Sequence, residues 1–335
     1  MEQQLEEDIL KSSTKFKELK EEIGRHLVGN ELQQDLVLIG LLANGHVLLE
    51  SVPGLAKTLL VKLLANALDL DFKRIQFTPD LLPADLIGTE IYNPKSHLFE
   101  TIKGPVFTNL LLADEINRAP AKLQSALLEA MEEKQVSIGN ETFKLDDPFI
   151  VLATQNPVDQ EGTYLLPEAQ VDRFMMKVKI DYPGRSQESE IIRRMAHPEK
   201  SMTIKQVLCK EDIFEARKLV DKIYMDKKIE DFILDIVFST RLMFDHLSER
   251  QDKQSLVFLE NLIERGASPR ASLNMILACK AHALLKQRAY VNLEDVKAIS
   301  NPVLCHRIHL SYEAEAEGLN EEEIIDEIFK TLKSP

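Results

Sequence analysis

The sequence predicts an α/β protein, in which a parallel sheet covered by helices is followed by a smaller helical region. Between residues 45 and 180, short apolar runs alternate with stretches of helical periodicity, as in a parallel sheet with helices on both faces. After Pro183 and Gly184 the strand pattern stops. A chain of 335 residues also suggests two domains. We therefore predict domains over residues 1–183 and 184–335.

Five apolar runs are the expected strands of the first domain. They are HVLLE (46–50), FKRIQF (72–77), NLLLAD (109–114), PFIVLAT (148–154) and MMKVKI (175–180). Residues 1–25, 56–68 and 120–134 have helical spacing. Two further segments, 88–107 and 135–145, are expected to form hairpins because turn residues separate short β-prone runs.

Composition indicates a soluble globular protein, with 44% hydrophobic and 29% charged residues. The formal net charge of −14 argues against broad binding to nucleic acid or anionic membrane, since both require basic surface. No apolar window is long enough for a transmembrane helix, and the acidic start MEQQLEEDIL is unlike a signal peptide. Three widely spaced cysteines, Cys209, Cys279 and Cys305, suit a reducing compartment. We expect a cytoplasmic protein.

The stretch LLESVPGLAKTLLVKLL (48–64) has the outline of a phosphate-binding loop between a strand and a helix. In such a loop, backbone N–H groups and a helix N-terminus face phosphate oxygens, while a lysine adds charge and a hydroxyl reaches Mg²⁺. Lys57 and Thr58 stand where those two side chains are required, and Gly54 follows Pro53 as a turn requires. The alternative is an ordinary strand–turn–helix junction with an exposed lysine.

Two positions depart from the usual pattern G-x-x-x-x-G-K-[ST]. Ser51 and Ala56 replace its two glycines. Ala56 is compatible with the loop if its φ is negative. Ser51 is the less comfortable change, because glycine at that position often permits an unusual backbone angle.

Acidic and amide side chains follow two later strands. Asp114 and Glu115 end the run NLLLAD, and Asn156 follows PFIVLAT. Asp114 can support Mg²⁺, largely through its waters; Glu115 can act as general base on an attacking water; and Asn156 can orient that water. Taken singly, the acids could instead favour a helix N-terminus, and Asn156 could be a turn residue. Together the three strand ends favour a nucleotide-hydrolysing site.

These residues carry a resemblance to a known family. The motifs are ESVPGLAKT (50–58), LLADEINRAPAKLQSALLEAMEE (111–133), LATQNP (152–157), GTYLLPEAQVDRF (162–174) and GASPRA (266–271). Together they resemble the MoxR family of AAA+ ATPases, over roughly residues 20–320. The resemblance implies a AAA+ P-loop αβα sandwich with a parallel sheet, followed by a small all-helical lid domain. Alanine before the lysine is usual in that family, so Ser51 is the true deviation.

The resemblance also implies roles for residues outside the loop. Arg173 matches the arginine finger that reaches the γ-phosphate held by a neighbouring subunit; the alternative is a surface ion pair with Asp172 or Glu168. Arg270 matches sensor 2 of the lid; the alternative is an arginine at a helix start. Arg118 could act across subunits, and the two hairpins match insertions that face the pore of related ring ATPases. The implied nucleotide-binding residues are Val28, Gly29, Ser51, Val52, Pro53, Gly54, Leu55, Ala56, Lys57, Thr58 and Leu59.

The implied activity is hydrolysis of ATP to ADP and phosphate with Mg²⁺, in a homo-hexameric ring. The implied task is chaperone-like remodelling or maturation of protein complexes, including metal-cofactor insertion, with partners that carry a von Willebrand factor A domain. Two alternatives stay open. Ser51 makes a non-hydrolysing nucleotide-binding adaptor plausible, and a nucleic-acid motor would share the insertions, although the net charge of −14 weighs against it.

Overall fold

The structure is a computed structural model that describes residues 2–52, 54–156, 164, 166–195, 204–249 and 251–335. Its contacts divide the chain into two compact units. One comprises Lys15–Arg173 and Val178–Phe214, and the other Met1–Thr14, Phe174–Lys177 and Glu215–Pro335. The predicted boundary at 183 falls just before helix α7 (Arg185–Met195) and stays a prediction.

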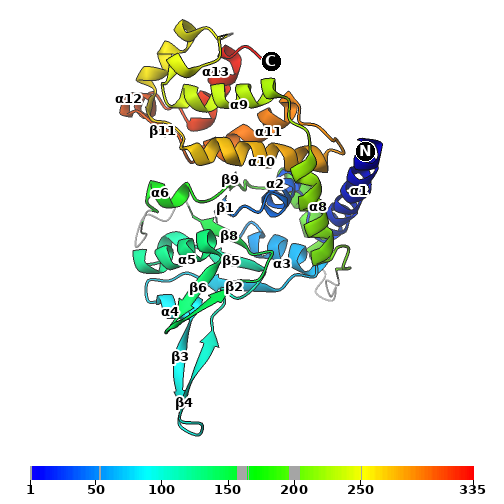
Figure 1. The fold of residues 1–335 in the computed structure, drawn as a ribbon, viewed down its shortest axis with the longest axis vertical. Helices are drawn as coiled ribbons and strands as arrows, with labels where there is room; N and C mark the ends of the chain where they lie inside the picture. The colour runs from blue at the N-terminus through cyan, green and yellow to red at the C-terminus, as the bar shows by residue number, and fades with distance from the viewer. Residues whose placement is uncertain (1, 53, 157–163, 165, 196–203, 250) are drawn as a thin grey trace. The chain divides into compact units, whose positions relative to one another are not determined.

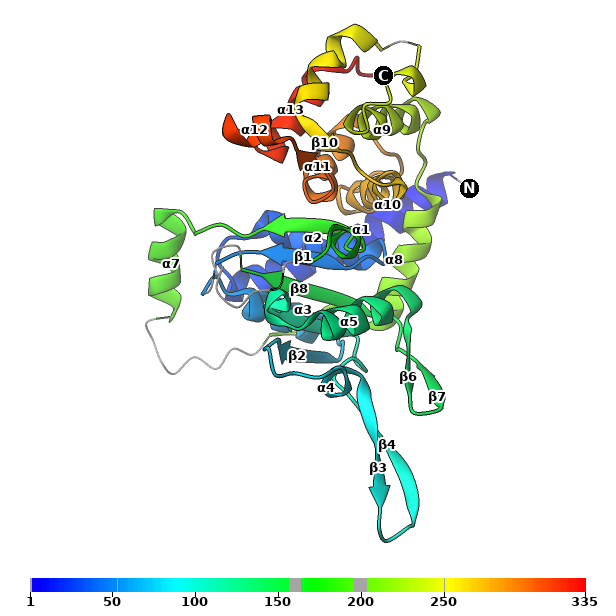
Figure 2. The same ribbon diagram turned by 90° about the vertical axis from the view of Figure 1, so that its left-hand side faces the viewer.

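A five-stranded sheet forms the centre of the first unit (Figures 1 and 2). The order is β2-β5-β8-β1-β9, and the pairs β2/β5, β5/β8 and β8/β1 are parallel. All five predicted runs form these strands, which confirms the prediction. Their bounds are Val47–Glu50 for β1, Phe72–Gln76 for β2, Leu110–Asp114 for β5, Ile150–Gln155 for β8 and Met176–Lys179 for β9.

The three helices predicted in the first domain are also present: α1 spans Glu2–His26, α3 Lys57–Ala67 and α5 Ala121–Glu133. A further helix, α2, spans Glu31–Leu42 and was not predicted. Helices α2, α3 and α5 lie beside the strands of the central sheet in Figure 2. Their apolar stripes, such as Leu60, Val61 and Leu64 of α3, are buried, as expected of helices that cover a parallel sheet. Among the described helices, none combines the length and hydropathy that a bilayer crossing needs.

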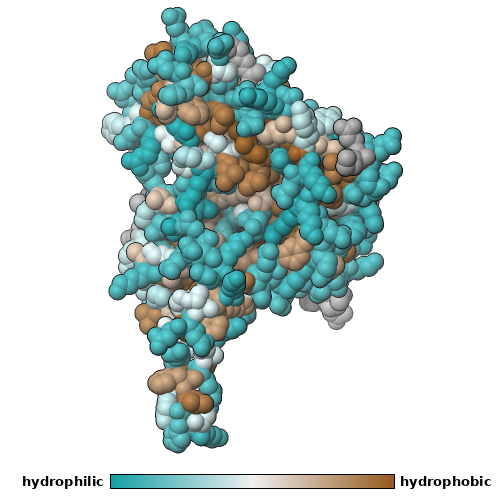
Figure 3. Space-filling model, in the orientation of Figure 1, coloured by the Kyte–Doolittle hydropathy of each residue, from teal (hydrophilic) through white to brown (hydrophobic). Residues whose placement is uncertain are grey.

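Both predicted hairpins are confirmed. After the short helix α4 (Pro83–Ile87), β3 (Gly88–Asn93) pairs antiparallel with β4 (Leu98–Lys103). Similarly, β6 (Gln135–Ile138) pairs with β7 (Glu141–Lys144). The first hairpin extends away from the sheet in Figure 1. In Figure 3, part of its surface is hydrophobic. Its exposed large apolar side chains are Ile91, Tyr92, Leu98, Phe99 and Ile102.

The C-terminal part of the chain is mainly helical, with one departure from the predicted all-helical pattern. Its helices are α8 (Lys210–Lys222), α9 (Lys227–Thr240), α10 (Pro269–Leu285), α11 (Leu293–Leu304), α12 (Tyr312–Ala316) and α13 (Glu321–Thr331). A two-stranded ribbon joins β10 (Ile263–Arg265) to β11 (His309–Leu310). With only three and two residues, these strands are too short for alternation to reveal them.

A buried histidine links β1 to two neighbouring elements. His46, just before β1, is 6% exposed. Its Nδ1 accepts the Val151 N–H at 3.0 Å, and its Nε2 lies 3.1 Å from the Met131 carbonyl oxygen. Because a backbone N–H can only donate, Nδ1 is unprotonated and Nε2–H donates. Burial lowers the pKa of His46 to about 4, although the Met131 carbonyl opposes this shift.

We predict that His46 makes the protein less stable in acid. The neutral ring is favoured in the folded state, so its contribution is complete above the unfolded pKa near 6.5 and is lost as pH falls toward 4. His46→Gln should therefore reduce the loss of unfolding free energy between pH 7 and 4 by roughly 3 kcal/mol. Urea unfolding at a series of pH values measures this, with the exposed-hairpin variant His97→Asn as control. Parallel curves for wild type and His46→Gln would contradict the assignment.

Candidate nucleotide-binding site

Strand register brings the predicted site residues to one edge of the sheet. In the β5/β8 pair Ala113 lies opposite Ala153, and in the β1/β8 pair Glu50 lies opposite Gln155. The three strands are parallel neighbours, so their carboxyl ends meet. The loop that starts at Ser51, the acids after β5 and the asparagine after β8 are therefore adjacent. This is the arrangement that the sequence predicted from strand order alone.

Lys57 lies across its own loop and near both acids. Its Nζ donates to the carbonyl oxygens of Ser51 and Val52, at 3.3 and 3.4 Å. Burial lowers the pKa of Lys57, and the negative charges of Asp114 and Glu115 oppose that shift. The ammonium group is thus within electrostatic reach of both carboxylates.

Backbone strain in the loop lies at Ala56, where the sequence suggested Ser51. Among the described residues of this loop, the left-handed positions are Gly54 (φ +87°) and Ala56 (φ +56°), and Ser51 is not one of them. The condition under which Ala56 would suit the loop without strain, a negative φ, is therefore not met. Ala56 precedes the first turn of α3, and a left-handed alanine there costs about 1 kcal/mol. The Ser51 N–H donates to the Gln155 carbonyl at 3.2 Å in an ordinary extension of the sheet.

Asp114 is a buried carboxylate with several donors around it. Thr154 Oγ1 donates to its Oδ1 at 2.6 Å. Arg74, on the neighbouring strand β2, donates to Oδ2 through Nε at 3.1 Å and through a terminal nitrogen at 2.6 Å. Asp114 is 7% exposed, and a buried charge without such partners would be costly. These donors satisfy the oxygens of the Asp114 side chain at the end of β5.

Glu115 occupies a strained position beside Asp114. Its backbone is left-handed, with φ +57° and ψ +50°, and its N–H donates to Thr154 Oγ1 at 2.8 Å. One hydroxyl thus orders both acids. The Glu115 carboxylate forms an ion pair with Arg118 Nε at 3.1 Å. Arg118, which the sequence suggested for a neighbouring subunit, here contacts the acid of its own chain.

Asn156 follows β8 and is 5% exposed. Its backbone carbonyl accepts a long hydrogen bond of 3.4 Å from the Asn117 side chain. Since Ser51 pairs with Gln155, Asn156 lies beside the start of the phosphate loop. Its role in orienting water stays a prediction.

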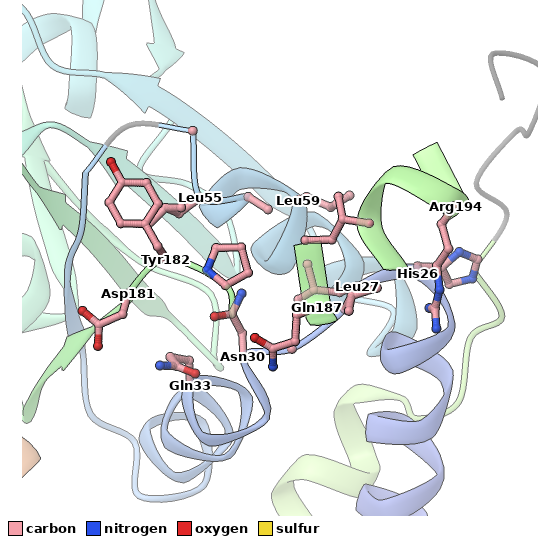
Figure 4. A pocket seen from close by; sticks show the side chains of 16 residues that line it. His26, Leu27, Asn30, Gln33, Leu55, Leu59, Asp181, Tyr182, Gln187 and Arg194 are labelled. Atoms are coloured by element: carbon pink, nitrogen blue, oxygen red, sulfur yellow. The ribbon is translucent and has the colours of Figure 1, made fainter. Parts of the chain in front are cut away.

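A cavity of about 300 Å³ adjoins the phosphate loop (Figure 4). It contains the predicted residues Val28, Gly29, Gly54, Leu55, Ala56 and Leu59, whereas Pro53 lies outside the described residues. Its size is at the lower end of the range for small-molecule sites. Further lining residues are His26, Leu27, Asn30, Gln33, Asp181, Tyr182, Pro183, Gln187, Ile191 and Arg194.

Neither of the two arginines assigned by resemblance is among the residues that line this cavity. Arg173 forms an ion pair with Glu132 of α5 at 3.0 Å, a partner that the sequence did not suggest. Its Nε is buried and has no hydrogen-bond partner among the described residues. Arg270 belongs to the other compact unit, at the start of α10. The catalytic roles of both arginines stay predictions.

The donor set fits Mg²⁺ and a nucleoside triphosphate. Thr58, the second residue of α3, and Asp114 offer the oxygen ligands that Mg²⁺ prefers. Lys57 and the N-terminus of α3 offer positive charge and N–H groups to phosphate. The cavity beside them has apolar walls from Leu27, Leu55 and Leu59, suitable for a nucleobase.

Sequence reasoning missed three contributors. Thr154 is part of the apolar run of β8 and was not singled out. Once β5 and β8 are paired so that Ala113 lies opposite Ala153, its hydroxyl is expected to lie beside Asp114. Arg74 stood in a run taken for an ordinary strand, and its contact with Asp114 becomes visible only once β2 is known to pair with β5. Gln187 follows the predicted domain boundary, so no spacing argument connects it with the loop.

Comparison with known proteins agrees with this fold. A family model described as "ATPase family associated with various cellular activities (AAA)" matches residues 46–176, and a AAA lid domain model matches residues 259–328. The sheet, loop and lid therefore define a AAA ATPase.

Relatives place the chain more narrowly. It is 44% identical to the chaperone MoxR1 of Mycobacterium tuberculosis, over 94% of this chain and 81% of that protein. It is also 44% identical to the uncharacterized protein YeaC of Bacillus subtilis, over 94% and 93%. A crystal structure from Cytophaga hutchinsonii, named a "putative ATPase", superposes with a TM-score of 0.91 at 48% identity, covering 99% of both chains. The chain belongs to the MoxR family of AAA+ ATPases.

We predict that Ser51 is neutral or favourable in its loop. Glycine at this position would relieve no strain, would add unfolded-state entropy, and would remove the hydrogen bond from Ser51 Oγ to the Val52 carbonyl. Ser51→Gly should lower the unfolding free energy by about 1 kcal/mol. In the matched variant Ala56→Gly, relief of strain should offset the added entropy, leaving stability nearly unchanged. Urea unfolding measures both, and a stabilising Ser51→Gly would contradict the assignment.

Proposed function

We propose that the chain hydrolyses ATP to ADP and phosphate at a site shared between neighbouring protomers of a ring. The observation that carries this proposal is the meeting of Lys57, Asp114 and Glu115 at one sheet edge, beside a cavity of nucleoside size. Membership of the AAA family supports it. The second acid, Glu115, also supports turnover. A protein that only bound nucleotide would not need this carboxylate beside Asp114, held by a left-handed backbone.

In the proposed mechanism each residue has a separate task. Lys57 and the N-terminus of α3 bind the phosphates. Thr58 and Asp114 would hold Mg²⁺, which supplies charge neutralisation on the phosphates when bound. Glu115 takes a proton from the attacking water, which requires that its carboxylate leave Arg118 or share it. Asn156 orients that water, and Arg173 of a neighbouring protomer stabilises charge on the transferred phosphoryl group.

The wider task that we propose is chaperone-like remodelling or maturation of protein complexes, including metal-cofactor insertion. The name of the relative MoxR1, a chaperone, supports this direction. The exposed apolar side chains grouped on the β3–β4 hairpin, where the Tyr92 and Phe99 rings contact each other, support contact with a client protein, because a grouped exposed apolar surface is typical of an interaction site. A hexameric ring, a cytoplasmic location and a partner with a von Willebrand factor A domain belong to the same proposal. The nucleic-acid motor is disfavoured by the net charge of −14.

We predict that Glu115→Gln separates binding from turnover. The amide keeps the size of the side chain but cannot accept a proton, so phosphate release should fall at least 100-fold. ATP affinity should remain close to that of wild type, because Lys57 and the cavity are unchanged. Phosphate release and equilibrium ATP binding measure the two effects. Equal release by wild type and variant would favour the non-hydrolysing adaptor.

We also predict that Arg173 acts in trans. Arg173→Ala should retain ATP affinity and lose turnover by about 10³-fold, and Lys57→Ala should lose binding. Mixed rings of the two variants contain some sites with an intact lysine and an intact neighbouring arginine, so activity should partly return. Phosphate release across a range of mixing ratios measures this recovery. The matched control is a mixture of Arg173→Ala with the double variant Lys57→Ala/Arg173→Ala, which should not recover. No recovery in the first mixture would exclude a composite site.

A further inference from the structure

The cavity beside the phosphate loop contains a side-chain amide whose orientation is fixed. Gln187, near the start of α7, accepts the Gly184 N–H through its Oε1 at 3.0 Å. Amide oxygen and nitrogen are often hard to distinguish, but a backbone N–H can only donate, so the oxygen must face it. The NH₂ group of Gln187 is therefore the end of the amide that does not face the Gly184 N–H.

That NH₂ group lies against the backbone at Gly29. A Cβ added at Gly29 would lie 2.9 Å from Gln187 Nε2 and 3.2 Å from its Cδ. Gly29 also has φ +75°, a conformation that favours glycine. The missing side chain at Gly29 thus leaves the room that the amide occupies. Figure 4 shows Gln187 among the side chains that line the cavity.

The Gln187 NH₂ group makes no hydrogen bond among the described residues, whereas two other long polar side chains of the cavity are engaged. Arg194 donates to the carbonyl oxygens of Gly24 and Arg25, and Gln33 donates to that of Lys179. An amide nitrogen is a donor only. A ligand that satisfies it must present an acceptor between the apolar walls, as a purine ring nitrogen does.

We propose that Gln187 recognises the purine base of the nucleotide by donating from Nε2 to a ring nitrogen, with Gly29 making room for the amide. This inference rests on the proposed ATP-binding function and names the residue that selects the base. Leu27 and Leu59 provide the apolar surfaces beside the ring, and Gln187 provides polar recognition. Gln187 thus belongs to the nucleotide site, although it lies far along the chain from the phosphate loop.

The test compares ATP with inorganic tripolyphosphate, each with Mg²⁺, by calorimetry on the full chain. Gln187→Glu keeps an oxygen for the Gly184 N–H and replaces the donor with an acceptor. Gln187→Met removes the donor without adding charge. Both variants should bind ATP about tenfold more weakly than wild type. Tripolyphosphate has no base. Gln187→Met should bind it as tightly as wild type does, and Gln187→Glu should lose less affinity for tripolyphosphate than for ATP.

The outcomes separate this inference from the proposed function. Wild-type ATP affinity in both variants would overturn the role of Gln187 while leaving the nucleotide site intact. Equal weakening of ATP and tripolyphosphate would also overturn it, since the effect would then be a general one on charge or folding. A wild-type chain that binds tripolyphosphate but not ATP would contradict the proposed function itself.

Discussion

The acidic side chain of Asp114, buried at the end of β5, is the constraint on which the rest of the site depends. A buried charge is tolerated only when donors and opposite charge surround it, and here they come from three directions. Thr154 approaches from β8, Arg74 from β2, and Lys57 is within electrostatic reach from α3. Each of these contacts requires the parallel register of the central strands. The order β2-β5-β8-β1 therefore places Asp114 between a guanidinium and a hydroxyl.

Two non-glycine residues with left-handed backbones flank this charge. Ala56 ends the phosphate loop and Glu115 follows Asp114. Such conformations cost of order 1–3 kcal/mol each and persist where the surroundings determine them. At Ala56, the turn into α3 fixes the backbone, since the Ala56 carbonyl accepts the Leu60 N–H at 2.9 Å. At Glu115, the bond to Thr154 fixes it.

Sequence reasoning recovered the elements that local pattern specifies. The apolar runs of β5 and β8, the turn residues of the hairpins and the acids after β5 all follow from spacing and residue type. It could not recover contacts that depend on pairing between distant segments. Arg74 contacts Asp114 only because β2 lies beside β5, and Gln187 reaches the cavity only through the tertiary placement of α7. The positive φ at Ala56 could not be predicted for a related reason: the path of the loop, rather than the residue type, decides which position takes a positive φ.

The phosphate loop has a second function as a wall of the cavity. Gly54, Leu55 and Ala56 line that cavity, while the next residue, Lys57, opens α3 and donates to the carbonyl oxygens of Ser51 and Val52. The left-handed turn at Ala56 therefore separates the residue that lines the cavity, Leu55, from the lysine, which lies across its own loop. The cavity wall and the start of α3 therefore share one turn. A change in backbone angle at Ala56 would move both together, whereas the backbone at Ser51, which simply continues β1, is not left-handed.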